Sequence, residues 1–273
     1  MDKLGPLFSY FSPRAEVFHA GTLCHNTDYQ SGKGWGYLHL LRRGEITVRN
    51  GERTAIAVSE PSILFYPRPC WHRFDVDESA PPDLVCATIN LGGSVGHPLS
   101  NMLPEYLEIP ISEAPSLQNA MELLFAEAFN DLCGRKVALD RLMEYVLILL
   151  VRYLINTENY QSGVIAGLAH PKLALSLNAI HKYPDRNWSL ETLADEAGMS
   201  RASFAKHFRT TLDCTPLDYL TSWRLSIAQS LLKRGQSIKA TAPKVGYQSA
   251  AAFTRVFAQR MGISPSAFQQ AHE

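Results

Sequence analysis

The sequence predicts an α+β protein with two domains, a small β-barrel followed by an all-α domain. The chain has 273 residues, of which 46% are hydrophobic, so each half can bury a core. Short segments rich in β-branched and aromatic residues fill residues 21–95, and helical periodicity replaces them from residue 111 onward. We therefore expect a barrel at 1–110, a helical extension at 111–156, a linker at 157–169 and the all-α domain at 170–273.

Charge is divided between the two halves. The net charge is zero, but residues 1–165 carry 13 basic and 19 acidic side chains, whereas residues 166–273 carry 13 basic and 7 acidic ones. A local excess of positive charge is what contacts with nucleic-acid phosphates require. The C-terminal half is therefore the candidate for binding a polyanion.

Strands are expected wherever short β-rich segments are separated by turn residues. Six or more such strands favour a small barrel or sandwich. The segments are YLHLL, EITVRN, RTAIAV, SILFYP, HRFDV and LVCATINL.

Two amphipathic helices are expected at 111–156. Leu117, Met121, Leu124 and Phe125 form one apolar stripe; a second consists of Leu142, Tyr145, Val146, Leu149 and Tyr153. These helices could pack within one chain or form a homodimer, and the pattern leaves both open. The linker assignment rests on the polar, glycine-containing composition of TENYQSGVIAGLA.

The helical domain contains two copies of a helix-turn-helix pattern. In residues 188–211, Ser189 and Ser200 are expected N-caps, Gly198 ends the first helix, and Phe204 and Phe208 point inward. Residues 238–261 repeat the plan, with Ser249 as cap and a second pair of inward phenylalanines at Phe253 and Phe257. A connecting helix, WRLSIAQSLL, lies between them. Two such units can place two helices in DNA major grooves.

One residue departs from this pattern. Pro243 lies inside the first helix of the second unit, where a proline costs about 3 kcal/mol unless it is in the first turn. We expect the second unit to be shortened or tilted.

Residues 171–270 resemble the AraC/XylS family of transcription regulators. The resemblance rests on the Gly-Tyr turn at 246–247, the paired phenylalanines and the closing segment GISPSAF. It implies binding to promoter DNA and contact with RNA polymerase, with recognition helices in successive major grooves. Counted from the caps, the expected DNA-facing residues are Arg201, Ala202, Ala205, Lys206 and Arg209 in one helix and Ala250, Ala251, Thr254 and Arg255 in the other.

The N-terminal strands resemble a cupin barrel, although the metal motifs are incomplete. Gly34, His39 and Glu45 match part of the first motif, whose second histidine is missing, and Pro67, Pro69 and His72 match part of the second. This degenerate match supports the fold more than an enzymatic metal centre. A cupin-type metal-dependent enzyme with an appended helical domain is the alternative function, but it needs three or four ligands with open positions.

Cys24, His39, His72 and Cys86 form a candidate sensor site, since each could point into the barrel. Two thiolates and two imidazoles would suit zinc or copper(I), and a thiol beside an imidazole would suit redox sensing. Simple core packing is the third interpretation. The four residues, together with Arg73 and the HPKL segment, also resemble the cupin-type branch of the family that responds to reactive chlorine species.

The compartment is predicted from what the sequence lacks. The first twenty residues have no continuous apolar segment, and YVLILLV is far shorter than the ~20 residues of a membrane span. Five cysteines, an odd number, do not suggest a disulfide framework. We expect a cytoplasmic protein that is not an enzyme and has no membrane partner.

Overall fold

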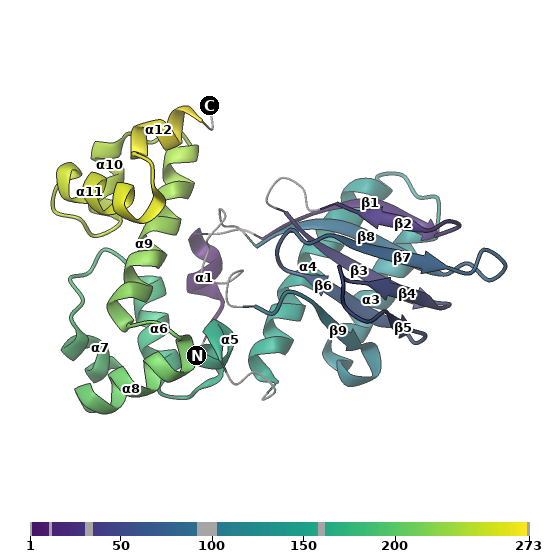
Figure 1. The fold of residues 1–273 in the computed structure, drawn as a ribbon, viewed down its shortest axis with the longest axis horizontal. Coiled ribbons are helices and arrows are strands. Elements are labelled where there is room, and N and C mark those ends of the chain that lie inside the picture. The colour runs from purple at the N-terminus through teal and green to yellow at the C-terminus, as the bar shows by residue number, and fades with distance from the viewer. Residues whose placement is uncertain (1, 11–12, 31–34, 92–102, 158–161, 272–273) are drawn as a thin grey trace. The chain divides into compact units, whose positions relative to one another are not determined.

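The computed structural model describes residues 2–10, 13–30, 35–91, 103–157 and 162–271. Gly34 and part of the expected linker, residues 158–161, lie outside the described residues. The chain divides into two compact units (Figure 1). The barrel unit comprises Pro13–Leu91 and Pro104–Leu154, and the helical unit comprises Ile155–Glu273 together with α1 (Gly5–Tyr10).

Two antiparallel sheets build the barrel unit. One has the strand order β1-β8-β3-β6-β9 and the other β2-β7-β4-β5. All six segments expected from the sequence contain strands, and the three further strands, β1, β2 and β9, lie outside those segments. The strands are β1 (Arg14–Thr22), β2 (Thr27–Tyr29), β3 (Gly36–Arg43), β4 (Ile46–Arg49), β5 (Ile56–Val58), β6 (Ser62–Tyr66), β7 (His72–Val76), β8 (Asp83–Asn90) and β9 (Leu107–Pro110).

The inner strands of the first sheet are buried on both faces, whereas the edge strand β1 has exposed residues. Every residue of β6 is buried, as are five consecutive residues of β8, a pattern typical of a sheet covered on both sides. The inner face packs against the second sheet in one apolar core that includes Leu64, Phe74 and Leu84. On β1 the register shifts at Val17, whose amide donates to Asp140 Oδ1 of the following helical segment at 2.7 Å.

That segment is helical as expected. It contains η1 (Ile111–Glu113), α3 (Pro115–Ala128) and α4 (Arg135–Asn156). Leu117, Met121 and Leu124 of the expected α3 stripe are buried. The expected α4 stripe is partly wrong, because Tyr145 is 50% exposed and the buried face is rotated toward Met143, Leu147 and Leu150.

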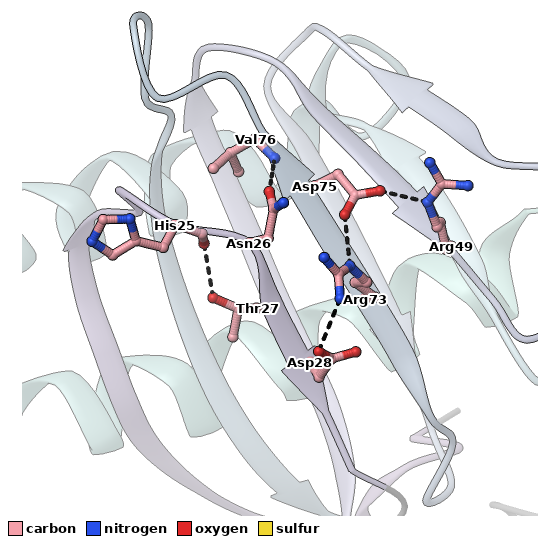
Figure 2. Close-up of polar contacts among 8 residues, drawn as sticks. All are labelled: His25, Asn26, Thr27, Asp28, Arg49, Arg73, Asp75 and Val76. Carbon is pink, nitrogen blue, oxygen red and sulfur yellow. Dashed lines mark hydrogen bonds and ion pairs between the residues drawn. The ribbon is translucent and has the colours of Figure 1, made fainter.

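The outer face of the second sheet is polar and faces solvent. A row of alternating charges runs across β2, β7 and β4, in which Arg73 bonds to Asp28 and Asp75, and Asp75 also accepts from Arg49 (Figure 2). Because neighbouring residues of a strand point to opposite faces, Arg73 lies on this surface while His72 points into the core.

The helical unit contains both expected helix-turn-helix pairs, α7–α8 and α10–α11, joined by the long helix α9. Ser189, Ser200 and Ser249 cap their helices as expected, and the four paired phenylalanines are fully buried. The helices are α5 (Gly163–Ala169), α6 (Leu173–Lys182), α7 (Leu190–Glu196), α8 (Arg201–Leu212), α9 (Pro216–Lys233), α10 (Ile238–Lys244), α11 (Ala250–Met261) and α12 (Pro265–Gln270).

Helix α5 lies within the segment expected to be a linker. Its residues Val164 to Leu168 are buried, and a Cβ on Gly167 would meet Leu177 at 2.8 Å and Leu212 at 3.1 Å. The small residues that suggested a flexible segment therefore allow α5 to approach α6 and α8 closely. No single described helix is long and apolar enough to span a membrane. Helices α5 and α6 together have that length and composition, but the chain bends by 110° between them.

The expected shortening of the second unit is wrong. Pro243 lies in the last turn of α10, not the first, and α10 has seven residues, as α7 does. The helix ends directly afterwards, with the Gly246 amide bonded to the Pro243 carbonyl. Because the helix stops there, the proline ring removes one helical hydrogen bond without interrupting a longer helix.

Candidate nucleic-acid interface and barrel cluster

The expected DNA-facing residues of α8 lie at the protein surface. Arg201, Ala202, Lys206 and Arg209 are exposed and Ala205 is half-buried, while Phe204 and Phe208 hold the opposite side of the helix in the core. The spacing i, i+1, i+4, i+5 and i+8 places the five on one helical face. His207, which we did not single out from the sequence, is also exposed on α8, and its ring bonds to the Ser203 carbonyl at 2.8 Å.

Helix α11 presents a smaller and less basic face. Ala251 and Arg255 are exposed, and Ala250 and Thr254 are half-buried. Arg255 occupies the position that Lys206 has in α8, counted from the capping serine of each helix. Another arginine of α11, Arg260, bonds to Asp218. The two faces have the exposure that contact with DNA requires, and the roles of individual residues stay predictions.

The barrel core contains a direct contact between two histidines. His39 on β3 and His72 on β7 come from opposite sheets, and their Nε2 atoms are 2.8 Å apart. Both side chains are fully buried. Burial lowers the pKa of His72 to about 4 and lowers the pKa of His39 well below its ordinary value, with the neighbouring His72 adding to the effect. Both imidazoles are therefore neutral near pH 7.

The hydrogen bonds of this pair determine where its protons are. His72 Nδ1 lies 3.0 Å from the Cys70 carbonyl, which can only accept, so Nδ1 carries the proton. The neutral His72 then accepts at Nε2, and His39 must donate from its own Nε2. His39 Nδ1 is left with a buried lone pair that has no partner among the described residues.

Cys86 and Tyr29 complete this cluster. Cys86 lies directly opposite His39 in the β3–β8 register, and its Sγ is 3.7 Å from the Tyr29 hydroxyl. Burial raises the pKa of the Cys86 thiol to about 12, so the thiol is protonated. His72 stacks with both Tyr29 and Tyr66, at ring-centroid distances of 4.7 and 3.9 Å. We call His39, His72, Cys86 and Tyr29 the barrel cluster.

Two residues expected near the cluster lie elsewhere. Cys24 is exposed between β1 and β2, with its Sγ 4.0 Å from the Thr22 carbonyl. Glu45 is exposed in the turn that joins β3 to β4. The structure thus brings together three of the four candidate sensor residues, and Tyr29 is a member that the sequence did not indicate.

The arrangement does not form the expected four-ligand metal site. The two Nε2 atoms bond to each other, and Cys24, the fourth expected ligand, is exposed outside the cluster. Among the described residues, no group of three or more His, Cys, Asp or Glu side chains could hold a metal ion. The residues present therefore do not fit a four-coordinate zinc or copper centre in this conformation.

Comparisons with known proteins agree with the two units. Residues 2–156 match the Cupin family, and residues 193–271 match a Helix-turn-helix domain. An uncharacterized HTH-type transcriptional regulator of Haemophilus influenzae is 30% identical over 260 residues, 87% of each chain. RclR of Escherichia coli, an RCS-specific HTH-type transcriptional activator, is 27% identical over 99% of this chain and 98% of its own length.

Among solved structures, the DNA-binding domain of AdpA in complex with target DNA is 31% identical, with a TM-score of 0.35, over 37% of this chain and 92% of that one. The relatives are named as transcription regulators, which supports a regulator over the cupin-enzyme alternative. With a cupin domain before a helix-turn-helix domain, and relatives that match it over nearly their whole length, the chain belongs to the AraC-type family of DNA-binding transcription regulators.

Proposed function

We propose that the barrel senses a chemical signal at the barrel cluster and that this signal controls how the two recognition helices engage a promoter. The observation that carries the proposal is the direct bond between His39 and His72 beside the Cys86 thiol, inside a core made mostly of apolar side chains. Buried polar groups cost stability unless they are paired, and His39 Nδ1 has no described partner. A group kept at such a cost favours a functional role.

An oxidant is the signal that we favour. One full-length relative is named RCS-specific, and thiols are the side chains that oxidants modify reversibly. Cys24 is exposed and accessible, whereas the protonated Cys86 is a poor nucleophile, because the thiolate is the reactive form. We therefore propose that Cys24, which lies outside the barrel cluster, reacts first, and that Cys86 of the cluster reacts only after the barrel opens. By analogy with the same relative, we propose activation rather than repression.

Substitution of each cysteine tests this proposal in a promoter-reporter assay with the full chain. Cys24→Ser or Cys86→Ser should abolish the response to oxidant while DNA binding without oxidant is retained. Cys133→Ser is the matched control, because Cys133 is also exposed but lies outside the barrel strands. If both barrel variants respond like the parent, the two thiols are packing residues and the proposal is wrong.

A zinc or copper ion stays a second candidate signal. Binding would require His39 and His72 to separate and Cys86 to lose its proton. Metal analysis of the purified protein, with and without oxidant, decides between the two. A stoichiometric metal in the parent, lost in a His39→Ala variant, would favour the metal over the thiol chemistry.

Partners besides DNA complete the proposal. Leu123, Leu132, Val137 and Tyr145 of the α3–α4 region are each at least 50% exposed, which supports a homodimer through these helices. Sedimentation of the parent and of Val137→Glu would test it, since a monomeric parent would contradict it. Activation of a promoter would also require contact with RNA polymerase. Because promoter DNA and RNA polymerase are the proposed partners, we propose that the protein acts in the cytoplasm.

A further inference from the structure

Helix α9 supports both DNA-binding pairs. The first pair packs on the N-terminal half of α9, where the Tyr219 hydroxyl lies 2.7 Å from His181 Nε2 of α6 and the Tyr219 ring packs against Phe208 of α8. The second pair packs near the C-terminal half, where Gln229 bonds to Met261 of α11 and Lys233 lies over Phe268 of the following helix α12. The orientation of one pair relative to the other therefore depends on contacts around the middle of α9.

Arg224 occupies this middle position and faces both pairs. Its Nε donates to the Pro184 carbonyl at 2.7 Å and one terminal nitrogen donates to the Arg186 carbonyl at 2.9 Å. Both carbonyls belong to the loop between α6 and α7. On the other side, the guanidinium lies 5.7 Å from the centre of the Tyr247 ring, in the turn between α10 and α11.

The two segments that Arg224 joins are themselves firmly held. In the first loop, the Trp188 indole donates to the Tyr183 carbonyl at 2.8 Å, and the Arg186 guanidinium lies over the Trp188 ring. In the second turn, Tyr247 packs against Phe253 of the recognition helix α11. Arg224 thus connects a fixed loop of the first pair to a residue that touches the recognition helix of the second.

Gly246 shows how close this approach is. A Cβ at residue 246 would lie 2.5 Å from a terminal nitrogen of Arg224, and the backbone has φ = +79°, a conformation that glycine adopts without strain. The Gly-Tyr turn therefore serves two purposes, since it reverses the chain and leaves space for the guanidinium.

The distance between successive major grooves of DNA makes the relative orientation of the two helix-turn-helix pairs important. Recognition helices on one face of the duplex lie ~34 Å apart, whereas α9 with its 18 residues is only ~27 Å long. Rotating one pair by about 11° at a radius of ~17 Å moves its recognition helix by ~3.4 Å, the rise of one base pair. A small error in orientation would therefore misplace a helix by a whole base pair.

We propose that Arg224 is a positioning residue that fixes the orientation of the second helix-turn-helix pair and thereby sets the spacing between the two DNA half-sites. The guanidinium suits this role because its planar fork can donate to two carbonyls while its face meets an aromatic ring. The proposal rests on both recognition helices entering DNA, and duplexes that carry a single half-site report that separately.

The experiment measures affinity as a function of half-site spacing. Full-length parent, Arg224→Gln and Arg224→Lys are titrated by fluorescence anisotropy, at one salt concentration, with duplexes obtained by binding-site selection on the parent. The series has one or two base pairs inserted into or removed from the spacer, and two further duplexes keep only one half-site each. Arg234→Gln, an exposed arginine at the end of α9, is the matched control for loss of charge.

The parent should lose about tenfold in affinity when the spacing changes by one base pair, since a displaced helix loses its base contacts; this loss corresponds to ~1.4 kcal/mol. Arg224→Gln should bind all spacings within about threefold of one another, yet bind each single half-site within about twofold of the parent. Arg224→Lys, which keeps the charge and can donate to one carbonyl, should be intermediate, and Arg234→Gln should keep the parental profile.

Two results would overturn the proposal. An unchanged spacing profile in Arg224→Gln would show that α9 alone fixes the orientation, and an equal loss at single half-sites would assign Arg224 to a phosphate contact. Thermal unfolding checks that each variant is folded. If Arg224→Gln does not fold, the spacing profile of Arg224→Lys decides, and a parental profile there refutes the role.

Discussion

Acidification is expected to destabilise the barrel through His72. The pKa of this residue is lowered from 6.5 to about 4 in the folded protein because the imidazole is buried. At a pH between 6.5 and about 4, His72 binds a proton in the unfolded chain but not in the folded barrel. The free energy of unfolding therefore falls as the pH falls. The loss begins near pH 6.5 and is complete near pH 4.

The magnitude follows from the two pKa values. Between pH 7 and pH 5, protonation of His72 in the unfolded chain alone should lower the free energy of unfolding by about 2 kcal/mol. His39, whose pKa is also lowered and which faces His72 and His19, adds to the loss in the same direction. The barrel should therefore lose at least this amount, a large fraction of the stability of an ordinary domain.

Hydrogen exchange of the full chain measures this loss in the barrel alone. Opening free energies are obtained by mass spectrometry for peptides that cover β3 and β8, at pH 7 and pH 5, with intrinsic rates corrected for pH and with EDTA present to exclude metal binding. His72→Phe should reduce the difference between the two pH values by about 2 kcal/mol, because the titrating group is gone. Phe74→Leu, a core substitution that involves no titratable group, should lower the free energy of unfolding about equally at pH 7 and pH 5. A parent that is equally stable at both pH values, or a His72→Phe variant with the full parental difference, would refute the reasoning.

Three further predictions follow from other parts of the molecule. In the native protein iodoacetamide should modify Cys24 quickly and Cys86 only after denaturation, because the pKa of the buried thiol is raised to about 12; peptide mass spectrometry checks this, and equal rates would contradict it. Arg255→Ala should relax the base preference at one position of one half-site, for a loss of ~1–3 kcal/mol there, whereas an unchanged consensus in binding-site selection would place Arg255 on the backbone. A fragment 155–273 should be more stable in thermal unfolding than 170–273, since only the longer one keeps α5 against α8; equal melting temperatures would contradict this packing.

The DNA-binding pairs could be predicted from the sequence because their signals are local. Serine caps such as Ser200 and Ser249, and phenylalanines four residues apart, depend only on helical geometry, and the second copy repeats the first. The barrel strands were predictable for a similar reason. Strand β1 was missed because only Ala15 and Val17 are buried in it, and the alternation of exposed and buried residues stops at the bulge after Val17.

The candidate site was only partly predictable because its geometry depends on pairing between distant strands. The sequence places His39 and His72 inside the barrel, but whether a third residue joins them depends on register, which puts Cys86 opposite His39 and leaves Cys24 beyond the end of β1. Tyr29 has no local signal, since it lies on a three-residue strand. Helix α5 was missed because a segment rich in glycine and alanine looks like a linker by composition. In the folded protein the same small residues allow close packing between helices.

The hydrogen bonds from His39 to His72 and from His72 to the Cys70 carbonyl form a series in which every donor points the same way. Protons now lie on His39 Nε2 and His72 Nδ1, and the series ends at the carbonyl of Cys70, a residue that is half-buried near the surface. If that carbonyl turned away, His72 could move its proton to Nε2, and His39 would then accept there and carry its own proton on Nδ1. A change in the turn at Cys70 would thus reverse the polarity of the whole series without creating a buried charge, so the interior could register an event at the surface while remaining electrically neutral.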